Sequence, residues 1–311
     1  MHSILQRAAL ALVLAALSFT RLAAAGTPAL QAPLAAVAQA GPALVALGDH
    51  GVVLRQRPGG AWAPARQVPV DTLLTAACFA NAQDGWAVGH GGAILSTRDG
   101  GDTWTLRHRV EQAPVLLAVA CLGPQRVLVT GAYGTALESR DAGQTWRPLA
   151  IGQGRDADLH LNAVVAGPDG ALLVAAEGGA AFRQAGDGAA WERVDTQASG
   201  SLWGGLRLRD GTLLLYGMGG RIVASRDGGR HWHRLDSGTR ESLAGATQLE
   251  DGRVVLVGNG GVLVASHGGG LDFAAQVRPD RQNLAAVAPR PGPEGGLWVF
   301  GAAGVAGQAA P

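Results

Sequence analysis

The sequence predicts an all-β repeat fold, and three observations support this prediction. Glycine accounts for 48 of 311 residues, which favours many tight turns between short strands over long helices. Tryptophans recur at steps of 42, 42, 45 and 41 residues, a period typical of propellers and solenoids, at Trp62, Trp104, Trp146, Trp191 and Trp232. A Gly-x-x-Gly turn recurs with one alanine substitution at Gly48/Gly51, Gly89/Gly92, Gly131/Gly134, Ala176/Gly179, Gly217/Gly220, Gly258/Gly261 and Gly301/Gly304. These seven turns indicate seven repeats.

Each repeat contains four runs of strand length, most clearly in the fifth. There the runs are 202–208, 213–217, 221–225 and 232–235, each apolar or alternating and bounded by Gly or Asp. Four short strands per repeat form one blade of a propeller. The first strands are expected to begin near Leu34, Leu74, Leu116, Leu161, Leu202, Leu243 and Leu284. We therefore expect residues 26–311 to form a seven-bladed β-propeller of four-stranded antiparallel blades.

The seventh repeat is shorter than the others. It offers runs at 284–289, 297–301 and 305–308, without a fourth strand after them. Because sheet edges are normally paired or covered, we expect the segment 27–33, which precedes the first blade, to supply the missing strand. Pro28 and Pro33 restrict that segment to an edge position.

The N-terminus has the pattern of a secretory signal peptide. A short region ending in Arg7 precedes an apolar run from 8 to 19, and Ala23-Ala24-Ala25 precedes Gly26. The apolar run is too short to span a bilayer core of about 30 Å. We therefore expect cleavage after residue 25 and an exported, periplasmic chain that does not span a membrane.

The charged residues exclude two classes of function. All 25 residues counted as Lys or Arg are arginines, so lysine chemistry is excluded. Removal of residues 1–25 takes away Arg7 and Arg21 and leaves 23 Arg against 24 Asp and Glu, a net charge of −1. A near-neutral chain lacks the phosphate-neutralising charge that nucleic acid binding requires.

The only cysteines, Cys78 and Cys121, fall on the first strands of neighbouring repeats and are out of step by one residue. Because side chains alternate along a strand, this offset points them in different directions and disfavours a disulfide. Buried free thiols are the expected state, with a disulfide as the alternative.

A second motif, Ser/Thr-x-Asp-x-Gly-x-Thr-Trp, lies between the third and fourth strands of several blades. It is nearly complete at 97–104, 139–146 and 225–232, and degraded where Arg57, Gly186 and Gly268 replace the acid. The Asp is suited to accept backbone N–H bonds in its own turn, the Gly permits positive φ, and the Trp closes the hairpin. Acids spaced one per blade cannot converge on one substrate, so we assign the motif a structural role. Its members are Thr97, Asp99, Gly101, Trp104, Ser139, Asp141, Gly143, Trp146, Ser225, Asp227, Gly229 and Trp232.

These motifs resemble those of the Asp-box (BNR-repeat) propellers, and within them the photosystem II stability and assembly factor family. The likeness is strongest in the second blade, where Asp84-Gly-Trp-Ala-Val-Gly-His-Gly-Gly92 leads into the motif at Thr97, and the general pattern covers 34–308. We call the segments 97–104, 139–146 and 225–232 the Asp-boxes. The resemblance implies a non-enzymatic scaffold in the thylakoid lumen or periplasm that holds a membrane-protein partner during assembly. It also implies an arginine-rich binding patch, to which no individual arginine is assigned.

Asp-box propellers also include sialidases, which as a family need an arginine triad, a Tyr nucleophile with its Glu partner, an acid/base Asp and usually an Arg-Ile-Pro motif. This chain has only Tyr133 and Tyr216, and its nearest match to that motif is Arg221-Ile-Val. His231 and His233 have no third metal ligand nearby in sequence, so no metal site is expected. We expect neither cofactor nor catalysis. A carbohydrate-active propeller enzyme or a carbohydrate-binding module is the alternative.

The Gly-x-x-Gly turns connect second and third strands, so they lie on the face opposite the Asp-boxes, together with the blade-to-blade connectors. A uniform frame that displays different side chains in each blade is how propellers form binding surfaces. The connectors add arginines suited to carboxylates or peptides. We expect a protein partner, from a membrane or envelope complex, to bind this face of a monomeric chain. The candidate residues are His50, His90, Arg107, Arg109, Tyr133, Glu177, Met218, Arg240 and Asn259.

Overall fold

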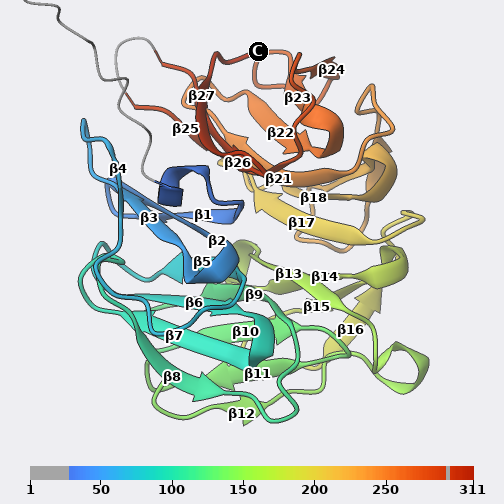
Figure 1. The fold of residues 1–311 in the computed structure, drawn as a ribbon. Helices are drawn as coiled ribbons and strands as arrows, with labels where there is room; N and C mark the ends of the chain where they lie inside the picture. The colour runs from blue at the N-terminus through green and yellow to red at the C-terminus, as the bar shows by residue number, and fades with distance from the viewer. Residues whose placement is uncertain (1–27, 292–294) are drawn as a thin grey trace, which may run out of the picture.

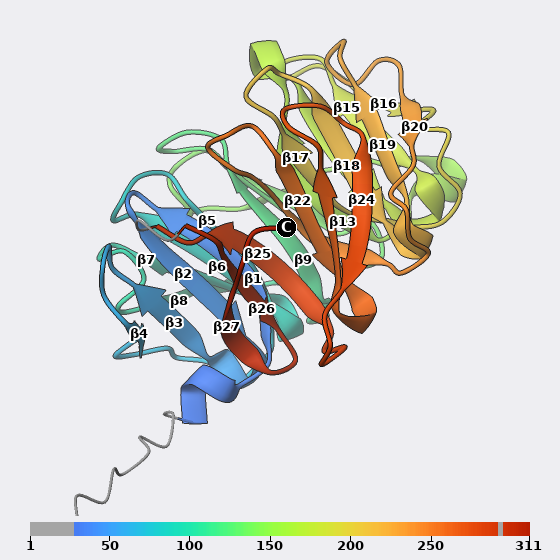
Figure 2. The same ribbon diagram turned by 90° about the horizontal axis from the view of Figure 1, so that it is seen from above.

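The computed structural model describes residues 28–291 and 295–311, and the expected signal peptide lies outside them. The described residues form seven antiparallel sheets around a ring, with blades 1 to 6 four-stranded and blade 7 three-stranded. The first and last blades, blue and red, lie side by side (Figures 1 and 2). The predicted seven-bladed β-propeller is confirmed.

The strands of each blade follow one another outward in chain order. The first strands of neighbouring blades contact one another round the ring, so they line its centre. These strands are β1 (Leu34–Ala40), β5 (Leu74–Phe79), β9 (Leu116–Cys121), β13 (Leu161–Ala166), β17 (Leu202–Arg207), β21 (Leu243–Gln248) and β25 (Leu284–Pro289). The second strands are β2 (Ala43–Gly48), β6 (Gly85–Gly89), β10 (Val127–Gly131), β14 (Leu172–Ala176), β18 (Leu213–Gly217), β22 (Val254–Gly258) and β26 (Leu297–Gly301).

The outer half of blades 1 to 6 consists of the third and fourth strands, and that of blade 7 consists of its third strand. The third strands are β3 (Val53–Gln56), β7 (Ala93–Thr97), β11 (Ala136–Ser139), β15 (Ala181–Gln184), β19 (Ile222–Ser225), β23 (Val262–Ser266) and β27 (Gly304–Gln308). The fourth strands are β4 (Trp62–Pro64), β8 (Thr105–Arg109), β12 (Arg147–Pro148), β16 (Trp191–Val194), β20 (His233–Leu235) and β24 (Phe273–Val277).

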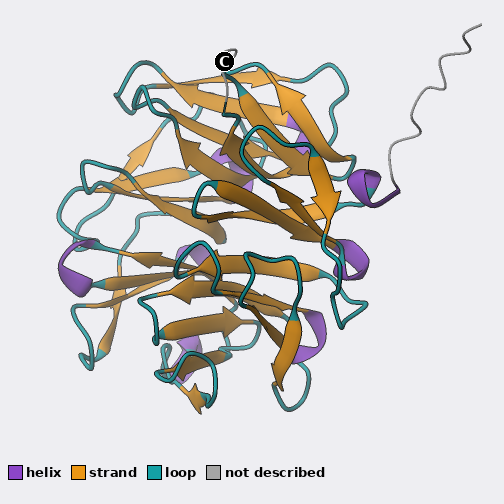
Figure 3. Ribbon diagram, turned by 90° about the vertical axis from the view of Figure 1, so that its left-hand side faces the viewer, coloured by secondary structure: helices purple, strands orange, loops and turns teal. Residues whose placement is uncertain are grey.

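Helical structure in the described residues is confined to short 3₁₀ turns, most of them at strand ends (Figure 3). They are η1 (Pro28–Gln31), η2 (Asp49–Gly51), η3 (His90–Gly92), η4 (Gly154–Asp156), η5 (Pro168–Gly170), η6 (Glu177–Gly179), η7 (Met218–Gly220) and η8 (Asn259–Gly261). Within residues 28–291 and 295–311, no helix has the length and hydropathy needed to cross a bilayer.

The hydrophobic core lies between the blades. The second strands of blades 2 to 6 are buried along their whole length, because a neighbouring blade covers each face of the sheet. Clusters of buried apolar side chains fill the blade-to-blade interfaces. In one cluster Trp86 and Val88 of blade 2 pack against Val119 and Val129 of blade 3. Each blade is therefore stabilised mainly by its two neighbours.

The ring closes differently from the expectation. Blade 7 has three strands in the described part of the chain, and Pro28–Gln31 is a 3₁₀ turn. A Cβ atom added to Gly304 would come 2.0 Å from the carbonyl oxygen of Leu30, so η1 packs against the start of β27, but it is not a strand of that sheet. Leu34 of blade 1 packs in one cluster with Phe300 of blade 7. Apolar packing between whole blades closes the ring, and the prediction of a closing strand in this segment is wrong.

Cys78 and Cys121 form a disulfide between blades 2 and 3, with Cα atoms 5.7 Å apart. The expectation of free thiols is therefore wrong. In a propeller, successive blades pack face to face, so one face of each sheet contacts the opposite face of the next sheet. Cys78 belongs to the face of blade 2 that carries Trp86 and Val88, and Cys121 belongs to the face of blade 3 that carries Val119. The offset of one residue therefore turns the two side chains toward each other.

Candidate functional site

The Gly-x-x-Gly turns and the blade-to-blade connectors share one face of the propeller, which we call the turn face. In blade 2 the N–H of His90 donates to the carbonyl oxygen of Leu73 at 2.9 Å, and that of Gly92 donates to Pro114 at 2.8 Å. This turn is thereby tied to the connectors before and after blade 2. The donors equivalent to His90 are Asp49, Ala132, Glu177, Met218, Asn259 and Ala302, whose acceptors are Pro33, Val115, His160, Ser201, Ser242 and Asn283.

Tyr133 is the most exposed large apolar side chain on the turn face, at 72% exposure. Its backbone is left-handed, with φ of 53°, a conformation that an L-residue keeps only when the surroundings impose it. The N–H groups of its neighbours Ala132 and Gly134 are bonded to the connectors. The ring packs edge-on against His160, with centroids 5.0 Å apart, and Glu177 of blade 4 accepts the His160 N–H at 3.3 Å. A large aromatic surface is therefore held in a fixed position.

The other candidates on the turn face are mostly polar. His50 pairs with Asp71 of the next connector through Nδ1 and Oδ1 at 3.0 Å. Arg109 donates from Nη1 to the carbonyl oxygen of Gly91 at 2.9 Å. Met218 adds a second exposed apolar group, at 43%. The remaining predicted residues in the turns and connectors are His90, Arg240 and Asn259.

Arg107 does not join the turn face, and its predicted placement is wrong. Its strand, β8, shifts register against β7, and the guanidinium reaches Ser96, with Nε and Oγ at 2.7 Å. The side chain lies beside Thr97 and Arg98, at the Asp-box end of blade 2. The position of Arg107 in the sequence of its strand does not show toward which end of the blade its long side chain extends.

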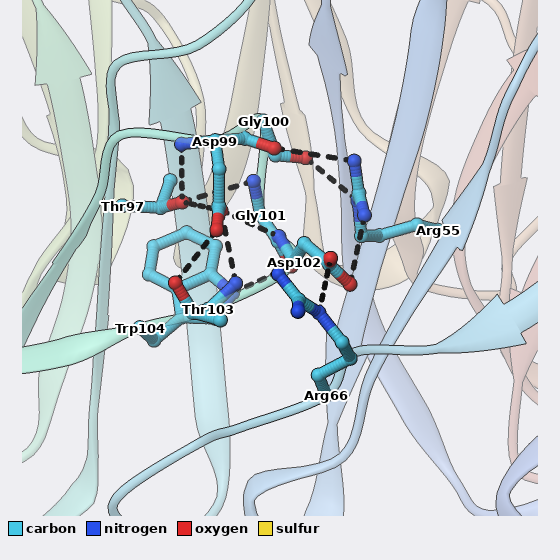
Figure 4. Close-up of polar contacts among 9 residues, drawn as sticks. All are labelled: Arg55, Arg66, Thr97, Asp99, Gly100, Gly101, Asp102, Thr103 and Trp104. Carbon is cyan, nitrogen blue, oxygen red and sulfur yellow. Dashed lines mark hydrogen bonds and ion pairs between the residues drawn. The ribbon is translucent and has the colours of Figure 1, made fainter.

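In the Asp-box of blade 2, Asp99 accepts hydrogen bonds from its own turn (Figure 4). Its Oδ1 accepts two backbone N–H groups, both at 2.9 Å, and its Oδ2 accepts the Thr103 hydroxyl at 2.6 Å. The Thr97 hydroxyl donates to Asp99 at 2.8 Å and accepts the N–H of Gly101 at 3.0 Å. Trp104 closes the turn by donating from Nε1 to the Gly101 carbonyl oxygen at 3.0 Å.

These bonds keep the box aspartates ionised. Burial raises the pKa of Asp99, but hydrogen bonds from Thr103, Thr97 and Asp102 together outweigh it and lower the pKa to about 2. Hydrogen bonds from Thr145 lower the pKa of Asp141 to about 2. Burial likewise raises the pKa of Asp227, but hydrogen bonds, chiefly from His231, hold that pKa well below its usual range. Carboxylates with such pKa values are poor proton donors and acceptors near neutral pH, so we interpret them as turn-forming groups.

A pocket of about 600 Å³ opens between blades 2 and 3 at the Asp-box end. Its walls include the Trp86 ring, Ser96, the side chains of Arg98 and Arg107, and Gly143 of the next Asp-box. Sequence reasoning missed this pocket, because no local motif marks a space between two blades. Ser96, which stands where blades 1 and 4 carry arginine, does not signal the pocket either, because blades 5 and 6 carry Ala224 and Ala265 at that place.

The two tyrosines lie in different surroundings. Tyr216 is buried, and burial raises its pKa, while Tyr133 packs against His160 on the turn face. His231 is bound to Asp227 of its own box through Nδ1 and Oδ2 at 2.6 Å. Throughout residues 28–291 and 295–311, no three His, Cys, Asp or Glu side chains gather as a metal site.

The comparisons with known proteins identify the family. The model of a family described as photosynthesis system II assembly factor YCF48 matches residues 59–305. The chain belongs to this family. No curated protein matches this chain in sequence.

Solved structures with a similar fold include two of YCF48. YCF48 bound to a D1 peptide has a TM-score of 0.71 at 19% identity, and the match covers 91% of this chain and 95% of that one. YCF48 from Cyanidioschyzon merolae has a TM-score of 0.69 at 17% identity, covering 90% and 96%. A streptogramin B lyase has a TM-score of 0.74 at 12% identity, covering 89% and 93%. Because enzymes share this propeller, function must be argued from the site.

Proposed function

We propose that this member of the YCF48 family is a non-enzymatic binding and assembly scaffold for a protein of a membrane or envelope complex. Family membership supports an assembly role, and the D1 peptide in a YCF48 structure supports a protein partner. The signal-peptide pattern of residues 1–25 supports export. The chain then acts as a monomer in the periplasm, or in the thylakoid lumen of a photosynthetic source.

The observation that carries this proposal is the rigid, exposed Tyr133. A ring already held in one position offers contact area at a small entropic cost, as anchor residues of interfaces do. His160 and Glu177 extend the surface onto blade 4, and Met218 extends it onto blade 5. This part of the turn face offers an apolar anchor flanked by hydrogen-bonding groups, which suits a peptide or a protein surface.

The test is capture of a partner from the native envelope by the tagged chain, with the captured proteins identified by mass spectrometry. The variant Tyr133→Ala/Met218→Ala is expected to lose capture of a membrane-complex subunit while its Tm stays close to that of the wild type, because both side chains are exposed. Arg226→Glu, on the Asp-box face, is the matched control and is expected to retain capture. Capture by the double variant at the wild-type level, with loss in Arg226→Glu, would place the binding site on the other face.

A further inference from the structure

In blades 1 and 4, an arginine of the third strand holds the blade against the Asp-box of the next blade. Arg55 donates to the carbonyl oxygens of Asp99 at 3.2 Å and Gly100 at 2.9 Å (Figure 4). Arg183 donates to the carbonyl oxygen of Gly228 at 2.7 Å. Both arginines are largely buried, and the turn of the following blade accepts these hydrogen bonds. We call this arrangement the arginine lock.

Blade 2 lacks the arginine lock, as do blades 3, 5 and 6, which carry Glu138, Ala224 and Ala265 at the same register. Arg55 pairs with Val45 and Arg183 pairs with Leu173, each of which lies three residues before the end of its second strand. In blade 2 the residue at that position is Trp86, and its partner is Ser96. A serine is too short to reach the Asp-box of blade 3. The pocket of about 600 Å³ opens at this interface, and we call it the blade 2–3 pocket.

The blade 2–3 pocket carries two guanidinium groups and one carboxylate, that of Asp84. Arg107 uses its Nε on Ser96, whereas its two Nη atoms and the whole Arg98 side chain have no hydrogen-bond or ion-pair partner among the described residues. Asp84 accepts a bond from Asn81 at 2.8 Å. The cationic groups outnumber the anionic one, and their unused donors are those that bind carboxylates in pairs.

The walls of the pocket are held in place by the surrounding structure. A Cβ atom on Gly143 would come 2.6 Å from Nε1 of Trp86, so only glycine lets the indole pack this closely against the next Asp-box. The Trp86 ring gives the pocket an apolar wall. Cys78, the cross-strand partner of Trp86, is joined to Cys121 of blade 3. The disulfide therefore links the two blades that line the pocket.

We propose that the blade 2–3 pocket binds a carboxylate of a partner protein, either its C-terminus or an acidic side chain. Arg98 and Arg107 donate to the carboxylate oxygens, and Trp86 contacts the apolar part of the bound residue. The site lies at the Asp-box end of the propeller, away from Tyr133, so it is a second binding site in addition to the turn face. Its occupation does not depend on Tyr133 or Met218.

The test uses the indole N–H of Trp86 as a local reporter in ¹H–¹⁵N spectra, assigned by its loss in Trp86→Phe. The probes are N-acetylglycine, which mimics a C-terminus, and N-acetylaspartate α-amide, which mimics a side chain. N-acetylglycinamide is the neutral control. A carboxylate probe is expected to shift the Trp86 resonance saturably in the millimolar range, as expected for so small a ligand, and the neutral amide is expected to leave it unchanged. The carboxylate that binds more tightly identifies the source.

Variants connect the signal to the proposed residues. Arg98→Gln and Arg107→Gln are each expected to weaken binding by about tenfold or more, the loss typical of a charge-assisted hydrogen bond. Arg226→Gln is the matched control, because it follows Ser225 in its Asp-box as Arg98 follows Thr97, and it is expected to bind normally. Ser96→Arg places an arginine at the register of the lock, where its side chain would fill the pocket, and is expected to abolish binding.

Three results would overturn the proposal. The first is no saturable shift with either carboxylate, and the second is an equal shift with the neutral amide. The third is unchanged affinity in both Arg98→Gln and Arg107→Gln, whose side chains are exposed and whose loss leaves the core intact. Inorganic phosphate binding more tightly than both carboxylates would overturn the assignment of the ligand.

Discussion

Replacing both Cys78 and Cys121 by alanine is expected to lower the free energy of unfolding by about 4 kcal/mol. The two residues are 43 positions apart in the sequence. In the chain-entropy model, a cross-link closing a loop of that length removes about 13 cal/mol/K from the entropy of the unfolded chain, which is about 4 kcal/mol at 25 °C. A chain of this size has an unfolding entropy of about 0.6 kcal/mol/K, so the corresponding fall in Tm is roughly 7 °C.

The measurement is urea denaturation followed by tryptophan fluorescence. Oxidised wild type is expected to unfold at a higher midpoint than reduced wild type, which should coincide with the double alanine variant. Adding reductant to that variant is the control and should change nothing, because it has no disulfide. If oxidised wild type and the variant share one midpoint, the loop-closure reasoning is refuted.

Two further predictions concern the Asp-boxes. Gly143→Ala is expected to destabilise the fold by about 2 kcal/mol, through strain at positive φ and overpacking, because its Cβ would come 2.6 Å from Nε1 of Trp86. Gly188→Ala, also at positive φ but with nothing within 4 Å, should lose less; equal losses of Tm would contradict the packing argument. The folded pKa of about 2 for Asp99 lies below the unfolded value of about 4, so its stabilisation is present above about pH 4 and lost as the pH falls through about 2. Asp99→Asn should therefore show a flatter dependence of stability on pH in this acid range, and an unchanged slope would refute the assignment.

The architecture of each blade could be predicted from the sequence, because its determinants are local and repeat. The Gly-x-x-Gly turns need backbone conformations that glycine adopts freely, and the Asp-boxes contain both the acceptor and the donors of their hydrogen bonds. Leucines mark the start of every first strand. The turn face follows from strand order alone, because an antiparallel blade places alternate turns at opposite ends, and Tyr133 could be recognised as an exposed residue of one such turn.

Contacts between blades were decided only by the tertiary structure. Cys78 and Cys121 meet because successive sheets pack face to face, and no pattern within one strand shows which faces will meet. Arg107 turns toward Ser96 because of a register shift in its strand. The blade 2–3 pocket is bounded by residues of two separate repeats, so no motif within one repeat marks it. The sequence determines each blade because its bonds are local, whereas the interfaces depend on how whole blades pack round the ring.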